Sequence, residues 1–172
     1  MTYPAGVDFT VITALTFDFV GWIIHNVGLG TTHWSVLGPQ TQGVVQYCYN
    51  SLCTYRSLRD MSSYQITVLF LAVAAITWSF SAMVLALHNI YKGYTFQSQT
   101  KTIPILGGAL SIVACVFAVI EVIIWAAEIH RDFRMVNQNF ELGYSFALTI
   151  VGACLYFLGG ILFITSQRKK ST

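Results

Sequence analysis

Three ionisable side chains stand inside long apolar stretches of the sequence, where charge is costly: Asp18, His25 and Glu121. Within a membrane such residues are rare and are candidates for proton or ion transfer; the alternative is a structural role, hydrogen-bonded to neighbouring helices. Lys and Arg are absent from these stretches. Asp18 is therefore either protonated or satisfied by Thr, Ser or Tyr groups. We favour the structural role, because one acidic group per stretch does not make a pathway.

The depth of these residues along helices predicts which of them can meet. At about 1.5 Å per residue, Asp18 lies roughly 14 Å and His25 roughly 24 Å along a helix that starts at Phe9. Glu121 lies roughly 27 Å along a helix that starts at Ile103 and runs in the same direction. His25 and Glu121 should therefore share one level of a bundle, where they could pair.

The cysteines divide into two kinds. Cys48 and Cys53 lie five positions apart in a polar segment, and on an oxidising side of a membrane they should form a disulfide. Half of a metal site is the alternative, but it needs two more Cys or His nearby, and only His33 lies in this segment. We favour the disulfide and expect no metal or other cofactor. Cys115 and Cys154 are expected to be small buried hydrophobic residues.

The composition determines the class of protein. Of 172 residues, 55% are hydrophobic and 9% are charged, against about 25% charged in soluble domains. A disordered chain needs more charge, and a nucleic-acid partner needs a basic surface. An all-α membrane protein remains, with residues 1–172 as one domain and the bilayer as a partner. Four stretches reach the roughly 20 apolar residues of a spanning helix: about 9–29, 64–88, 103–127 and 143–166.

Four spans place both termini on one side of the membrane and two loops on the other, at about 30–63 and 128–142. The basic residues that follow the last span, Arg168, Lys169 and Lys170, favour cytoplasmic termini, because cationic segments next to a span resist translocation. The loops are then extracellular or lumenal. Lys169 and Lys170 also match a dilysine signal for retrieval to the endoplasmic reticulum. A cationic anchor for the last span is the alternative.

The first loop predicts a small antiparallel sheet seated on the helices. The runs SVL (35–37), GVVQYCY (43–49) and LCTYRS (52–57) are rich in β-branched and aromatic residues. Turn residues separate them at Gly38-Pro39 and Asn50-Ser51.

This loop resembles that of the claudin superfamily, which also contains the peripheral myelin and epithelial membrane proteins and the calcium-channel gamma subunits. The family's first loop carries a tryptophan, then G-L-W-x-x-C, then a second cysteine. This chain has Trp34, then Gly43-Val44-Val45 before Cys48, then Cys53. Its G-Y-S-F at 143–146 is similar to that of epithelial membrane proteins and gamma subunits. Val45 stands in place of the second tryptophan and the loop is shorter, so a smaller sheet than in claudins is expected.

The resemblance implies a multi-pass plasma-membrane protein without enzymatic activity, acting in cell junctions or adhesion with itself or other claudin-like proteins. Its alternative is an auxiliary subunit that docks on an ion channel or receptor through small-residue helix faces. No metal-ligand cluster, nucleophile–base pair or phosphate loop stands out in the sequence. The candidate contact residues of the loops are Tyr47, Tyr49, Arg56, Arg59, Asp60 and Phe133.

The topology predicts that an epitope tag at the C-terminus is stained only after permeabilisation, because the termini face the cytoplasm. A tag inserted at Gly38-Pro39 should be stained on intact cells. Staining of the C-terminal tag on intact cells would show that the orientation is inverted.

Overall fold

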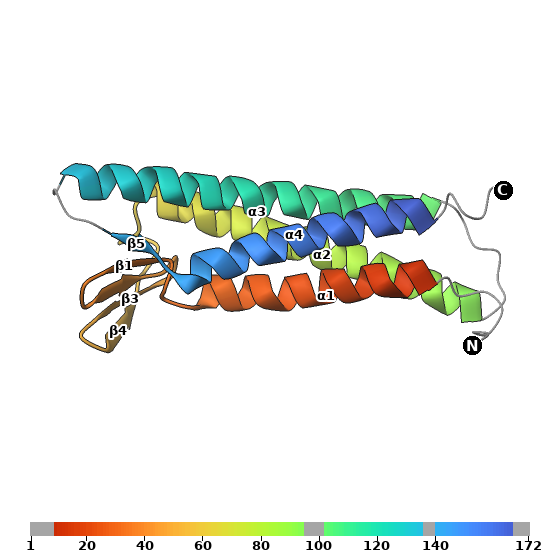
Figure 1. The fold of residues 1–172 in the computed structure, drawn as a ribbon, viewed down its shortest axis with the longest axis horizontal. Coiled ribbons are helices and arrows are strands. Elements are labelled where there is room, and N and C mark those ends of the chain that lie inside the picture. Colours follow the sequence, from red (N-terminus) through yellow and green to blue (C-terminus); the bar gives the residue numbers. More distant parts are fainter. Residues whose placement is uncertain (1–8, 95–101, 136–139, 167–172) are drawn as a thin grey trace.

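The computed structural model describes residues 9–94, 102–135 and 140–166, so Lys169 and Lys170 lie outside the described residues. Four helices run side by side and a sheet covers one end of them (Figure 1). Phe9 and Ser166 lie at the opposite end. All of these helices are long and apolar enough to cross a membrane. They are α1 (Phe9–Gly30), α2 (Ser63–Tyr94), α3 (Thr102–Met135) and α4 (Tyr144–Ser166).

Two helices continue past the ends of their apolar stretches. We expected α2 to end near residue 88 and α3 near residue 127, whereas they end at Tyr94 and Met135. Residues 128–135, which we expected in a loop, are therefore helical, and their position outside the membrane stays a prediction. Hydropathy marks where a helix leaves the apolar region, but the helix satisfies its own backbone and can extend into water. Glu128 and Arg131 support this extension as an ion pair one turn apart.

Small residues let the helices approach closely. A Cβ atom on Gly152 would lie 3.1 Å from the carbonyl oxygen of Gly21, so α4 and α1 meet almost backbone to backbone. Ala75, Ala118 and Ala153 form a buried cluster between α2, α3 and α4. Such residues favour van der Waals packing between membrane helices. These small residues pack against other helices of the same bundle. They therefore do not form the outer docking face that we expected for an auxiliary subunit.

The sheet is antiparallel, with the strand order β4-β3-β2-β1-β5. Two-residue turns join β1 to β2 at Gly38-Pro39 and β3 to β4 at Asn50-Ser51, as predicted. Asn50 and Ser51 have φ angles of 46° and 69°, the left-handed conformation of a tight hairpin turn. The strands are β1 (Ser35–Leu37), β2 (Gln40–Gln42), β3 (Gln46–Tyr49), β4 (Leu52–Tyr55) and β5 (Glu141–Leu142).

Two strands were missed from the sequence. The segment β2 reads Gln-Thr-Gln, which has no apolar alternation. The segment β5 has two residues and becomes a strand only by pairing with β1, about a hundred positions earlier in the chain. Within the predicted run 43–49, only Gln46–Tyr49 is a strand.

The adjacent glycines of α3 provide a matched test of helix packing. A Cβ atom on Gly108 would lie 2.7 Å from the carbonyl oxygen of Gly160, whereas one on Gly107 would meet ordinary contacts at 3.7 Å and beyond. We expect Gly108→Ala to destabilise the protein by about 1–3 kcal/mol, as overpacking does. Gly107→Ala should be neutral or stabilising, because alanine favours helix. Thermal unfolding of the two variants in detergent measures the difference; equal midpoints would contradict this packing.

Candidate functional site

Trp34 joins the sheet to the helices. Its side chain is fully buried, and its indole Nε1 donates a hydrogen bond of 2.7 Å to the carbonyl oxygen of Gly28 in α1. Its ring centroid lies 5.2 Å from that of Trp125 in α3 and 6.2 Å from that of Phe146 in α4. One side chain therefore contacts three helices at the base of the sheet.

The other residues of the loop motif also face the bundle. Val44 is fully buried in the same cluster as Trp34, and Val45, at the position of the family's second tryptophan, packs against that cluster. Gly43 passes so close to α1's end that a Cβ atom would lie 2.9 Å from the Cα of Thr32. The motif thus seats the sheet on the helices instead of presenting side chains to a partner.

A second attachment ties the start of α4 to the end of α1. The backbone N–H groups of Gly143 and Ser145 donate to the carbonyl oxygens of Trp34 and His33, each at 3.0 Å. The hydroxyl of Ser145 accepts a hydrogen bond of 3.1 Å from the backbone of His33 and lies 2.7 Å from the hydroxyl of Thr31. These bonds place β5 beside β1. From the sequence we noted residues 143–146 only for their resemblance to the family, and we did not predict their hydrogen bonds to Thr31, His33 and Trp34.

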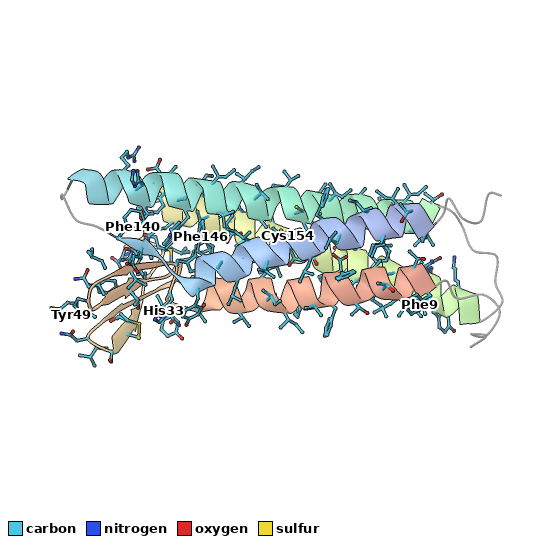
Figure 2. The ribbon with its side chains drawn as sticks, viewed as in Figure 1. Phe9, His33, Tyr49, Phe140, Phe146 and Cys154 are labelled. Atoms are coloured by element: carbon cyan, nitrogen blue, oxygen red, sulfur yellow. A yellow bond between two sulfur atoms is a disulfide. The ribbon has the colours of Figure 1, made fainter. Side chains whose placement is uncertain are left out.

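The predicted disulfide is present. Cys48 and Cys53 are directly paired residues of β3 and β4, and their sulfur atoms are bonded. Both sulfurs are used in this bond, so they are not metal ligands. Cys115 is half-buried, but Cys154, which we expected to be buried, is exposed on the outer face of the bundle (Figure 2). A membrane helix is apolar on all sides, so its sequence does not distinguish a lipid-facing position from a buried one.

The outermost strand presents an apolar surface. β4 has β3 on one edge and no strand on the other in the part of the chain that is described. All its residues are exposed, Leu52 by 78% and Tyr55 by 76%. Tyr49 on β3 and Leu58 after β4 are also exposed. Exposed hydrophobic residues on the helices can face lipid, whereas Tyr49, Leu52 and Tyr55 lie on the sheet beyond the bundle. Leu52 and Tyr55 are three positions apart and so project from opposite faces of β4. Apolar side chains on both faces of an exposed edge strand favour contact with another protein.

The predicted contact residues fall into two groups. Tyr47 and Arg56 are half-buried: the guanidinium carbon of Arg56 lies 5.5 Å from the ring centroid of Tyr47, and its Nη1 donates a hydrogen bond of 2.9 Å to Gln65 of α2. They brace the sheet against the bundle. Tyr49, Arg59 and Asp60 are exposed.

Four further positions remain: one predicted contact residue whose side chain is not described, and three exposed residues that we did not predict. Phe133 lies in α3, in a part where the structure does not describe side chains. The sequence missed Leu52, Tyr55 and Leu58, because only the strand order shows that β4 is an edge.

The intramembrane residues form two contacts in the bundle core. Asp18, His25 and Glu121 are all fully buried. The Nε2 of His25 lies 3.1 Å from the Oε2 of Glu121, which is the pairing that the depth argument anticipated. Asp18 does not join them directly; its Oδ2 accepts a hydrogen bond of 2.6 Å from the hydroxyl of Ser111.

Comparison with known proteins agrees with this architecture. A family model described as "Tight junction protein, Claudin-like" matches residues 1–171. No curated protein matches the chain in sequence. The match covers the four helices, the sheet at one end of them and the disulfide of β3 and β4. The chain belongs to the claudin-like family of tight junction proteins, as a membrane protein with four spans.

Proposed function

We propose that this protein is a non-enzymatic junction or adhesion protein of the plasma membrane, which binds a second copy of itself or another claudin-like protein through the edge strand β4. The observation that carries the proposal is the outer edge of β4, which pairs with no strand among the described residues and exposes Leu52 and Tyr55. The family assignment to tight junction proteins supports it. Cytoplasmic termini would place this sheet outside the cell.

Pairing of two β4 edges would contribute binding energy and would also fix the relative orientation of the two copies. An edge strand offers unpaired backbone N–H and C=O groups that can extend the sheet into a neighbour. Antiparallel pairing of two copies about a two-fold axis would also bring each Leu52 and Tyr55 against the partner, since such an interface uses the same patch twice. Burying an apolar side chain of this size contributes about 1.5–3 kcal/mol.

The edge is held in place before any partner arrives. The Cys48–Cys53 bond links β4 to β3, and the backbone N–H of Arg56 donates to the carbonyl oxygen of Val45 at 3.0 Å. The Arg56 side chain reaches Gln65 of α2. A surface that is already ordered loses less conformational entropy on binding, which suits a small interface.

An auxiliary subunit of an ion channel or receptor is the second candidate, and one observation favours it. A groove of about 590 Å³ runs between α1 and α2 on the outside of the bundle. These two helices pack less closely on each other than the other neighbouring pairs. A helix of a larger membrane protein could lie there. The groove is lined by Leu15, Thr16, Phe19, Trp22, Phe80, Met83, Val84 and Leu87.

The double variant Leu52→Lys/Tyr55→Lys tests the edge. Lysine on an edge strand opposes pairing, and both side chains are exposed, so the fold should be retained. We expect loss of self-association, measured by energy transfer between two labelled copies in one membrane and by aggregation of cells that express the protein. Leu142→Lys is the matched control, because Leu142 is 45% exposed on β5, at the opposite edge of the sheet.

The outcomes separate the candidates. Association that survives the double variant but is lost in Leu142→Lys would reject the β4 edge. Absence of self-association in the parent protein, together with stoichiometric recovery of a channel or receptor after mild detergent extraction, would favour the auxiliary subunit. In that case Phe80→Ala in the groove should reduce recovery of the partner, while both sheet variants should leave it unchanged.

A further inference from the structure

Polar side chains from all four helices meet in the centre of the bundle. Asp18 and His25 are seven residues apart on α1, so they lie on the same face two turns apart. The partners of this face come from the three other helices, and every member of the cluster has an exposed fraction of 0%. The cluster consists of Asp18 and His25 from α1, Ser79 from α2, Ser111 and Glu121 from α3 and Tyr156 from α4.

Hydrogen bonds order the cluster around His25. On one side its Nε2 lies 3.1 Å from Glu121 Oε2, and on the other its Nδ1 lies 3.3 Å from the hydroxyl of Tyr156. Tyr156 also lies within hydrogen-bonding reach of Ser79 of α2 and interacts electrostatically with both carboxyl groups, Asp18 and Glu121. Its phenol therefore contacts His25 directly and acts on Asp18 through the electrostatic field of the cluster.

The requirement for neutrality determines how this pair holds protons. An isolated buried charge is strongly unfavourable, so the pair is either imidazolium with carboxylate or imidazole with carboxylic acid. In the first arrangement both ring nitrogens of His25 carry protons; in the second, Glu121 donates to Nε2 and the proton stays on Nδ1. Nδ1 donates to Tyr156 in both of these arrangements, which leaves the O–H of Tyr156 free to donate elsewhere. In the other neutral tautomer, where Nε2 donates to the carbonyl oxygen of a protonated Glu121, Nδ1 instead accepts from Tyr156.

Acceptors for that O–H remain. Asp18 Oδ1 and Glu121 Oε1 are buried without a hydrogen-bond partner among the described residues, and Ser79 Oγ is the acceptor within reach of the phenol. Buried polar atoms nearly always have a partner, and internal water commonly supplies it. Gly159 of α4 packs closely against Asp18, since a Cβ atom there would lie 3.3 Å from Asp18 Oδ1 and 3.1 Å from the carbonyl oxygen of Ala14. The spans contain no Lys or Arg to neutralise Asp18.

We propose that these groups form a buried proton-binding site, in which Asp18 holds one proton, the His25–Glu121 pair shares another, and internal water together with Tyr156 links the two. The ligand is the proton, with water as the connecting molecule. The site is a binding site and does not provide a path across the membrane, because the apolar cluster of Trp34, Val44 and Trp125 fills the bundle towards the sheet. This proposal is independent of the role of β4.

Infrared spectroscopy of the full chain in lipid nanodiscs tests the site. At neutral pH the carbonyl band of a protonated carboxyl group should be present and should shift in heavy water. Asp18→Asn should remove the Asp18 component of this band, so that any band that remains belongs to Glu121 as carboxylic acid. Glu121→Gln should keep the band but shift its frequency, because the two groups are linked. Glu128→Gln is the matched control: Glu128 lies on the same helix, paired with Arg131 outside the cluster, and its loss should leave the band unchanged.

Tyr156→Phe removes only the linking hydroxyl and keeps the ring that packs in the core. In this background Glu121→Gln should no longer shift the Asp18 band. The proposal is overturned if the folded parent protein shows no protonated carboxyl band at neutral pH, or if Asp18→Asn leaves the band unchanged in intensity and frequency. A Glu121→Gln shift that persists without the Tyr156 hydroxyl would also overturn it. If Asp18→Asn does not fold, the parent and Tyr156→Phe spectra decide, since loss of the hydroxyl should itself move the band.

Discussion

Burial of Trp34 is the contact on which the arrangement of the whole molecule depends. The residue lies four positions after the end of α1, and its indole fills the space between α1, α3 and α4. The indole N–H donates a hydrogen bond to the carbonyl oxygen of Gly28. The sheet begins at the residue after Trp34. A sheet of such short strands has little core of its own, and isolated hairpins are marginal in water. Its position therefore follows from this anchor, from the Gly143 and Ser145 hydrogen bonds and from the Arg56–Gln65 contact.

The two ends of the sheet differ because only one of them is attached. β5 pairs with β1 and leads directly into α4, and Gly143 and Ser145, which follow β5, donate backbone hydrogen bonds to the segment around Trp34. β4 stands at the far edge, and its side chains are exposed throughout. The disulfide and the tight Asn50-Ser51 turn keep β4 in line with β3. A rigid strand with a free edge is thereby presented away from the membrane-spanning helices, which is the physical basis of the proposed self-association.

The helical bundle combines close apolar packing with a polar centre. Glycine and alanine bring the helix backbones together, and lipid supplies no partner for a polar group inside them. Each polar side chain in the core must then find its partner within the protein or in trapped water. The ionisable residues of the spans, Asp18, His25 and Glu121, are all buried in this interior. Their contacts cross from α1 to α3, which are not sequential neighbours.

The local sequence determined the four spans, the level at which His25 meets Glu121, and the disulfide-linked hairpin. The apolar stretches predicted four spans because the bilayer requires about 20 such residues, and the helical rise alone placed His25 level with Glu121. The cysteine spacing and the turn residues predicted the stapled hairpin. Only the tertiary structure decided that Tyr156 and Ser111 complete the core contacts, that β5 joins the sheet, that Cys154 faces outward and that β4 is the free edge. The physical reason is the same in each case: in these short strands and uniformly apolar helices, a residue's face and neighbours are set by packing against distant segments, which local periodicity does not encode.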